Sequence, residues 1–310
     1  MENLNYSKVF EVLVEETENY VKANNLEAMV LGISGGIDSA VVAAICHEVS
    51  KRTGIPLIGR SLPIKNKSDE FDVSKLVGEA FCSNFKIINL SLTTKSLVVE
   101  LKAEECAELT PIMEGNIQAR LRMMYLYNLA SILKGLVMST DNQTEYQLGF
   151  WTIHGDVGDF DPIQDLWKTE VYGLAEWLSN YYIDTLKSLN SAEEKLKYCR
   201  MYEAINESIG LTPTDGLGIS NSDLEQIGAK SYNEVDDILS RFIPFENFRK
   251  SYDSAGQIMH PHDQMAEYDC WSQLCSRYGE DVVNKVWNRH LASEFKRKKA
   301  PIYISREKYN

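Results

Sequence analysis

The chain has 310 residues, 44% of them hydrophobic and 25% charged, so it can bury a sizeable core. Its formal net charge of -13 argues against a nucleic-acid partner, because phosphate binding requires clustered Lys and Arg. No apolar run reaches the length of a membrane span, and the first six residues are neither basic nor apolar, so neither a membrane partner nor a signal peptide is expected.

Strand-like and helix-like patterns alternate through the first 140 residues. The apolar runs that predict buried strands cover residues 28–31, 56–63, 85–90 and 135–140. The patterns that predict helices cover residues 7–24, 40–45, 69–81, 100–109 and 116–134, and the fourth of these is expected to end at Pro111. This alternation predicts an α/β fold, a doubly wound parallel sheet flanked by helices. Ligands are expected beyond the carboxyl ends of the strands.

A glycine-rich stretch joins the first strand to the helix that follows. It consists of Gly32, Ile33, Ser34, Gly35, Gly36, Ile37, Asp38 and Ser39. Glycines allow close approach of the backbone to a ligand, and the helix N-terminus adds unpaired N–H groups that favour an anion. A carboxylate at Asp38 would repel a phosphate unless a divalent cation lay between them. Since the lysine of a Walker A loop is absent, the stretch predicts metal-dependent nucleotide chemistry of another kind.

An acidic stretch follows the fourth strand, from Ser139 to Val171. Its carboxylates are Asp141, Glu145, Asp156, Asp159 and Asp161. Packing them together is costly without a metal or polar ligand, whereas a solvated acidic loop would need neither. This stretch alone leaves both interpretations open.

The glycine-rich stretch resembles the pyrophosphate loop of synthetases that split ATP into AMP and pyrophosphate. With four further segments it resembles the motifs of ammonia-dependent NAD synthetases, in the order of that family: Gly115–Arg120, Ser139–Glu145, Gly149–Asp156 and Asp159–Val171. The resemblance implies an adenine nucleotide alpha hydrolase-like fold in a single domain of residues 1–310, with extra C-terminal helices. Relative to the family, residues 179–210 form a helical insertion and residues 241–289 an extended helical region.

The resemblance implies a ligase that joins deamido-NAD, ATP and ammonia into NAD, AMP and pyrophosphate through an acyl-adenylate, working as a homodimer. Besides residues 32–39, the ATP contacts that it implies are Thr140, Lys168 and Thr214. The deamido-NAD contacts that it implies are Arg120, Asp159 and Lys296. Asp38 and Glu145 would hold Mg²⁺. Asp156 would receive or orient ammonia, acting as a catalytic residue with Lys168.

Two positions depart from the family pattern and keep alternatives open. Ile153 stands where the family has lysine, and Phe295 where it has histidine. Both lie in segments implied to bind deamido-NAD, so another nicotinate-like or small carboxylate acceptor stays open, as does a nucleotide-binding protein without turnover. Transfer-RNA thiolation is disfavoured by the acidic composition and by six cysteines without a CxxC pair. Such cysteines are typical of reduced thiols in a cytoplasmic protein.

Overall fold

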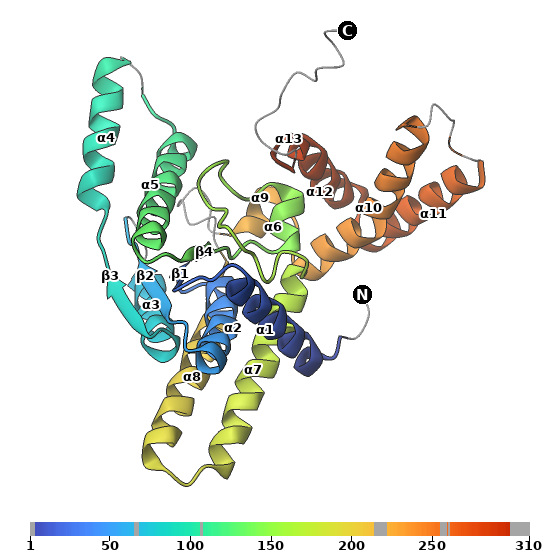
Figure 1. Ribbon diagram of the computed structural model, residues 1–310. Helices are drawn as coiled ribbons and strands as arrows, with labels where there is room; N and C mark the ends of the chain where they lie inside the picture. The colour runs from blue at the N-terminus through green and yellow to red at the C-terminus, as the bar shows by residue number, and fades with distance from the viewer. Residues whose placement is uncertain are drawn as a thin grey trace. The chain divides into compact units, whose positions relative to one another are not determined.

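Four parallel strands form the sheet that organises the chain, in the order β3-β2-β1-β4 (Figure 1). Their bounds are β1 Met29–Gly32, β2 Leu57–Ser61, β3 Asn84–Ile87 and β4 Leu136–Met138. The computed structural model describes residues 4–64, 68–105, 108–213, 222–254, 259 and 261–297. All four predicted strands and the parallel α/β class are confirmed. Because β1 lies between β2 and β4, the loops that leave β1 and β4 emerge side by side, where such sheets bind ligands.

Thirteen helices are present in the described part of the chain. Their bounds are α1 Tyr6–Ala23, α2 Ile37–Thr53, α3 Ser68–Phe81, α4 Ser91–Glu104, α5 Pro111–Ile132, α6 Gln143–Leu148, α7 Lys168–Ser188, α8 Ala192–Gly210, α9 Asp223–Ile227, α10 Tyr232–Ser254, α11 Pro261–Tyr278, α12 Glu280–Ala292 and α13 Glu294–Arg297. None of the described helices is both long and apolar enough to cross a membrane.

The helices around Pro111 differ from the prediction. The exposed helix expected over residues 100–109 is α4, which begins at Ser91 and ends at Glu104. Pro111 opens the next helix, α5, because a first-turn residue needs no intrahelical partner for its missing N–H. Thr110 caps that helix, and its side-chain oxygen accepts a hydrogen bond from Met113 N at 3.3 Å.

Alternate residues of β1 point to opposite faces of the sheet and so bury two separate clusters. Met29 and Leu31 join the larger cluster with α1, α2, α3, α7 and α8. Val30 faces α5 and packs in the smaller cluster with Met123 and Leu126. Helices therefore cover both faces of the sheet, which accounts for the almost continuous burial of β1 (Figure 1).

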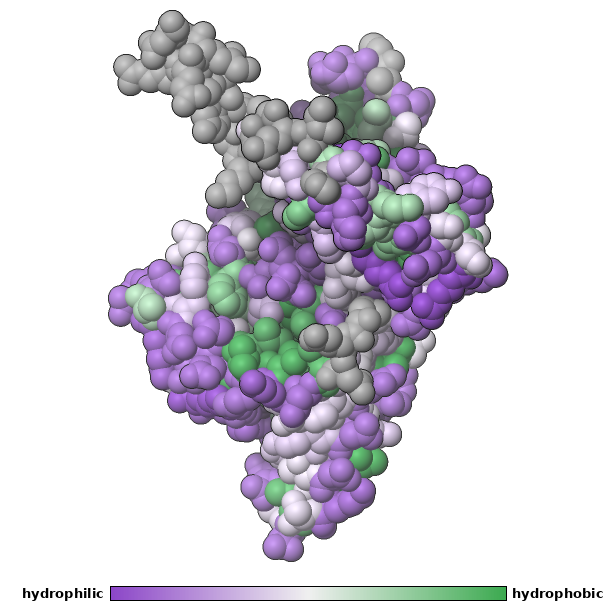
Figure 2. All heavy atoms as spheres, turned by 90° about the vertical axis from the view of Figure 1, so that its right-hand side faces the viewer, coloured by the Kyte–Doolittle hydropathy of each residue, from purple (hydrophilic) through white to green (hydrophobic). Residues whose placement is uncertain are grey.

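Helices α7 and α8 run side by side as a hairpin, which contains the predicted insertion (Figure 1). Tyr182 of α7 is 5% exposed and packs edge-on against Tyr198 of α8. Figure 2 shows the end of this hairpin, at the bottom of the view, as mostly hydrophilic and weakly polar. The hairpin thus buries one face against α1, α2 and α3 and exposes the other.

The chain divides into two compact units. The sheet unit comprises residues 2–143 and 151–226, and the C-terminal unit comprises residues 144–150 and 227–310, together with residue 1. The single domain expected from the sequence stays a prediction.

Candidate active site

The glycine-rich loop leaves the carboxyl end of β1 in a tight, internally bonded turn. Gly35 has a φ of 94°, a backbone conformation that residues with a side chain rarely adopt. Ser34 Oγ accepts a hydrogen bond from Gly36 N at 3.2 Å and lies 3.0 Å from Ser39 Oγ, which donates to Gly36 O at 2.9 Å. These bonds hold the loop in shape at the first turn of α2.

The loop side chains separate into two groups with different roles. Ile33 and Ile37 are 2% and 3% exposed and pack in the larger core cluster. The backbone N–H of Ile33 donates to Arg60 O at 2.8 Å, so this amide is used by the sheet. Ser34, in contrast, is exposed. The Ile33 amide is therefore already paired, and Ser34 is the exposed side chain at the start of the turn.

Asp38, in the first turn of α2, is held by two residues from distant parts of the sheet unit. Lys168 Nζ donates to Asp38 Oδ2 at 2.5 Å, and Asn142 Nδ2 donates to Asp38 Oδ1 at 2.8 Å. Lys168 is 2% exposed and Asn142 is fully buried. A buried lysine paired with a carboxylate beside an anion-binding turn is typical of a site that stabilises phosphate charge.

A pocket with a cavity volume of about 190 Å³ opens beyond the carboxyl ends of β1, β2 and β4. Its lining includes the loop residues Gly32, Ile33 and Ser34 and the predicted site residues Thr140 and Asp156. Leu62, Met123, Leu126 and Met138 supply an apolar wall. The pocket thus combines an apolar wall with polar groups at one end, as small-molecule sites commonly do.

Two arginines line the same pocket. Arg122 Nε donates to Leu62 O at 3.1 Å. Arg60 is 6% exposed, and its Nη1 donates to Gly59 O at 2.7 Å and to Asn84 Oδ1 at 3.1 Å. Arg60 Nε is buried and has no hydrogen-bond partner among the described residues. The lining residues of the pocket therefore include two arginines and the aspartate Asp156.

The residues expected on the deamido-NAD side lie in the loop that follows β4 and on α5. Arg120 Nε donates to Ile153 O at 3.3 Å. Asp156 Oδ2 accepts from Thr152 N at 2.6 Å, and Asp159 Oδ2 accepts from Val137 N at 2.9 Å. Asp156 and Asp159 are both exposed, and each carboxylate supports its own loop through these bonds.

Two further predicted residues belong to the C-terminal unit. Glu145 lies on α6, and its carbonyl accepts a hydrogen bond from Phe150 N at 3.0 Å. Lys296 Nζ donates to Gly149 O at 2.6 Å. Thr214 lies outside the described residues. The roles assigned to these three residues stay predictions.

Asn142 and Arg122 had no assigned role in the sequence analysis. Asn142 is the second polar residue after Thr140 at the end of β4, and Arg122 follows Arg120 by two positions. Asn142 follows β4, which lies beside β1 in the sheet. Its closeness to Asp38 could be predicted only if the order of the strands were known. Both arginines lie on α5, and the sequence does not show which of them faces the pocket, because this depends on how α5 is oriented on the sheet.

Asp161 is a half-buried carboxyl group beside this site. Its Oδ1 accepts from Ile163 N at 3.1 Å, and its Oδ2 is buried with no hydrogen-bond partner in the described part of the chain. Burial raises the pKa of Asp161 to about 7, although the hydrogen bond from Ile163 opposes the shift. The charge of Asp38 raises it further.

Asp161→Asn is expected to make the free energy of unfolding less dependent on pH between about pH 4 and 7. The carboxyl group of an unfolded aspartate has a pKa of about 4, so over this range the folded protein binds more protons, and its stability falls as the pH rises. The asparagine cannot ionise, and the melting temperature of the variant should change less with pH than that of the wild type. The melting temperature would be measured against pH without nucleotide for the wild type, for Asp161→Asn and for Asp165→Asn, an exposed control in the same loop. Parallel curves for all three proteins would contradict the prediction.

A parallel sheet whose first loop carries SGGIDS, with Asp38 paired to a buried lysine beyond a neighbouring strand, defines the pyrophosphate-loop class of ATP-using proteins. Residues 9–300 match the family model described as NAD synthase. The chain is 31% identical over 244 residues to the NH(3)-dependent NAD(+) synthetase of Thermococcus sibiricus, which covers 78% of this chain and 84% of that protein. The chain belongs to the NAD synthase family.

Two solved structures share the fold. The NMN synthetase of Francisella tularensis matches with a TM-score of 0.70 at 22% identity, over 98% of this chain and all of that one. The NH3-dependent NAD synthetase of Campylobacter jejuni, in complex with the nitrate ion, matches with a TM-score of 0.62 at 23% identity, over 97% of this chain and all of that one. The expected adenine nucleotide alpha hydrolase-like fold is consistent with both.

Proposed function

We propose that the protein is a ligase that amidates deamido-NAD with free ammonia, converting ATP into AMP and pyrophosphate. The observation that carries the proposal is the Asp38–Lys168 pair at the SGGIDS loop, in a chain of the NAD synthase family. The activity named for the relative from Thermococcus sibiricus, of which the chain covers 84%, supports free ammonia as the nitrogen source.

The chemistry proceeds in two steps. A carboxylate is a poor acyl donor, so the nicotinate carboxylate first attacks the α-phosphate of ATP and forms an acyl-adenylate with release of pyrophosphate. Ammonia then attacks the acyl carbon, loses a proton and displaces AMP. In the first step, negative charge develops on the departing pyrophosphate, and the N–H groups of the loop from Ser34 onward and the Lys168 ammonium would stabilise it. Thr140 and the apolar wall would position the nucleotide.

The described residues fit a magnesium ion that is bound mainly by substrate. They contain no group of three His, Cys, Asp or Glu side chains able to hold a metal, but Mg²⁺ commonly uses one or two carboxylates with phosphates and water. Asp38 offers such a carboxylate, and Glu145 is the second ligand predicted from sequence. When bound, Mg²⁺ would supply charge neutralisation for the phosphates.

The test is an assay of amide formation from ATP with two nitrogen sources and two acceptors. We expect NAD from deamido-NAD and ammonia, with AMP and pyrophosphate in equal amounts, and little product from glutamine. A second candidate function is amidation of nicotinate mononucleotide, and preference for this acceptor in the assay would replace the first proposal. The observations that favour it are Ile153 and the exposed Phe295, which depart from the family pattern. ATP binding without pyrophosphate release under any condition would exclude both.

Asp156→Asn is expected to slow amide formation by at least about tenfold while leaving ATP–pyrophosphate exchange intact. The carboxylate lines the pocket and can take the proton that ammonium must lose before attack, whereas the amide cannot. Exchange and NAD formation measured on the same preparations would separate the steps. Equal loss of both rates would contradict the role of Asp156.

We further propose that the protein is a homodimer that associates through the apolar surface of α4 and α5. A groove of about 410 Å³ is lined there by Leu90, Thr93, Leu121, Met124, Tyr125, Asn128, Leu129 and Ile132. Met124 is 56% exposed and Ile132 is 77% exposed, and apolar surface of this kind commonly marks an interface. In a two-fold dimer the same face would serve both subunits.

Ile132→Glu is expected to shift the protein from dimer to monomer in sedimentation velocity, because a charge would be buried in the interface. Leu196→Glu on α8, at a residue that is 54% exposed, is the matched control and should stay dimeric. A monomeric wild type, or equal behaviour of the two variants, would contradict the proposed surface.

A further inference from the structure

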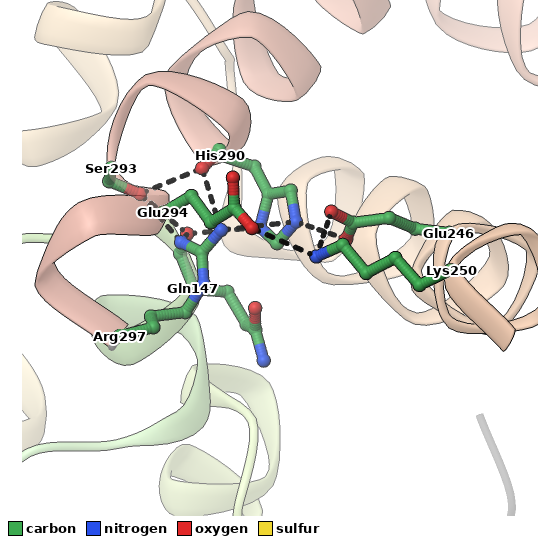
Figure 3. Close-up of polar contacts among 7 residues, drawn as sticks. All are labelled: Gln147, Glu246, Lys250, His290, Ser293, Glu294 and Arg297. Atoms are coloured by element: carbon green, nitrogen blue, oxygen red, sulfur yellow. Dashed lines mark hydrogen bonds and ion pairs between the residues drawn. The ribbon is translucent and has the colours of Figure 1, made fainter. Parts of the chain in front are cut away.

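The segment that precedes the loop of Asp156 is held within the C-terminal unit. Gln147 O, near the end of α6, is met by His290 Nδ1 at 3.1 Å, by Ser293 Oγ at 3.1 Å and by Arg297 Nη1 at 2.7 Å (Figure 3). These bonds fix the backbone ahead of the loop. Asp156 itself belongs to the sheet unit, so its orientation depends on the contacts that its own loop makes within that unit.

The carboxylate of Asp156 is bonded back to the start of its loop. Its Oδ2 accepts a hydrogen bond from Thr152 N at 2.6 Å, and Gly155 N donates to Thr152 O at 2.8 Å. Between them, His154 has a φ of 60°, a left-handed conformation that reverses the chain. Both backbone groups of Thr152 are thus used to close a tight turn, and a movement of Thr152 is passed directly to the carboxylate.

Thr152 is in turn held by helix α5. Its side chain is 5% exposed, and its Oγ1 donates to Asn116 Oδ1 at 2.8 Å. One turn further along α5, Arg120 Nε donates to Ile153 O at 3.3 Å. Gly155 packs so closely on Thr152 that a Cβ there would lie 2.7 Å from the threonine Cβ and Cγ2. The hydroxyl and methyl groups of Thr152 therefore fix the loop between α5 and Gly155.

The orientation of Asp156 matters because this residue lines the nucleotide pocket. A group that takes a proton has to lie within hydrogen-bond reach of the donor, about 2.6–3.2 Å. A displacement of about an ångström can lower the rate by up to roughly 10²-fold. The described residues that line the pocket include neither Asn116 nor Thr152, so this pair can affect the reaction only through the residue that it holds.

We propose that Asn116 and Thr152 are positioning residues, which hold the Asp156 carboxylate where it receives the ammonium proton. This inference rests on the proposed function, because it takes Asp156 as the acceptor of that proton. The contact between α5 and the loop thus serves the amide-forming step. Formation of the acyl-adenylate does not depend on it.

The test begins with Thr152→Val in the full-length protein, a change that removes the hydroxyl group and keeps the volume. The kcat of amide formation from deamido-NAD should fall about tenfold, while ATP–pyrophosphate exchange and the KM for ATP stay unchanged. Thr152→Ser keeps the hydroxyl and should recover most of the rate. Asn116→Ala removes the acceptor and should show the same loss as Thr152→Val, and it decides the matter if the valine variant fails to fold.

Thr17→Val is the matched control. Thr17 lies on α1 in the sheet unit, is fully buried and donates through Oγ1 to Leu13 O at 2.6 Å. Both valine variants therefore lose one hydrogen bond of a buried hydroxyl group, and only Thr152→Val should slow amide formation. Equal slowing in both would assign the effect to stability and overturn the inference.

Two further measurements separate positioning from a structural role. In a protein that already carries Asp156→Asn, Thr152→Val should slow amide formation no further, because the carboxylate that Thr152 holds is gone. Hydrogen exchange of the peptide covering residues 151–158 reports the loop directly and should rise in Thr152→Val. Faster exchange with an unchanged rate of amide formation, or additive effects of Thr152→Val and Asp156→Asn, would overturn the inference.

Failure of the proposed function gives a different result. A wild type that forms no NAD from deamido-NAD and ammonia would overturn that function. Normal amide formation in Asp156→Asn, by a wild type that does form NAD, would overturn the role of Asp156 and the positioning roles with it.

Discussion

Replacing Lys168 by methionine is expected to lower the rate of ATP–pyrophosphate exchange by about 10³-fold, the loss that follows removal of a preorganised donor to developing charge. Lys168 is 2% exposed, and its ammonium lies 2.5 Å from Asp38 Oδ2. Methionine fills a similar volume but carries no charge. The folded protein should also lose about 3 kcal/mol of stability, because Asp38 is left as a poorly solvated carboxylate.

Two variants separate the loss of activity from the loss of stability. Lys187→Met removes a lysine on the same helix that is 71% exposed and pairs with Asp184, and it should change neither property. The double variant Asp38→Asn with Lys168→Met removes both charges and should recover most of the stability but none of the exchange rate. Recovery of exchange in the double variant, or near-normal exchange in Lys168→Met, would show that Lys168 only neutralises Asp38.

Gly35→Ala is expected to lower the exchange rate by roughly 10²-fold, because a shift of the loop by about an ångström misplaces the groups that meet the phosphates. Gly35 has a φ of 94°, which an alanine adopts only under strain. The loop is bonded through Ser34, Gly36 and Ser39, so relief of the strain at Gly35 displaces its neighbours together. Exchange measured over a range of ATP concentrations would show both a higher KM and a lower kcat.

Gly54→Ala is the matched control for this variant. Gly54 ends α2 with a φ of 77°, and a Cβ there would meet nothing within 4 Å. Both alanine variants should therefore lose stability, by about 1 kcal/mol each, and only Gly35→Ala should lose activity. Equal activity of the two would indicate that the loop tolerates displacement and is not the phosphate site.

The fold was predictable where local pattern decides it. Continuous apolar runs such as Ala28–Leu31 indicate strands that are buried on both faces, and helices between them imply parallel pairing. The start of α4 at Ser91 was not predictable, because most of its residues are exposed and only Thr94 is fully buried. A helix that buries little apolar surface leaves little periodic signal.

The contacts of the candidate site were predictable only in part. The loop and Lys168 could be recognised by their motifs, but Asn142 and Lys168 reach Asp38 across 104 and 130 residues of chain. Such contacts depend on the order of the strands, and that order is not expressed in any local pattern. The same holds for Arg122, since the face of α5 that it occupies is set by packing on β1.

By itself, the sequence determined the α/β class, the family and the position of the glycine-rich loop, because residue spacing and motif order are properties of the chain alone. Only the tertiary structure decided which polar groups meet. It joined Asn142 and Lys168 to Asp38, kept Ile33 and Ile37 in the core, and brought Arg297 to the carbonyl end of α6. The physical reason is that burial and hydrogen bonding act between residues adjacent in space, and strand order and helix packing bring distant segments together.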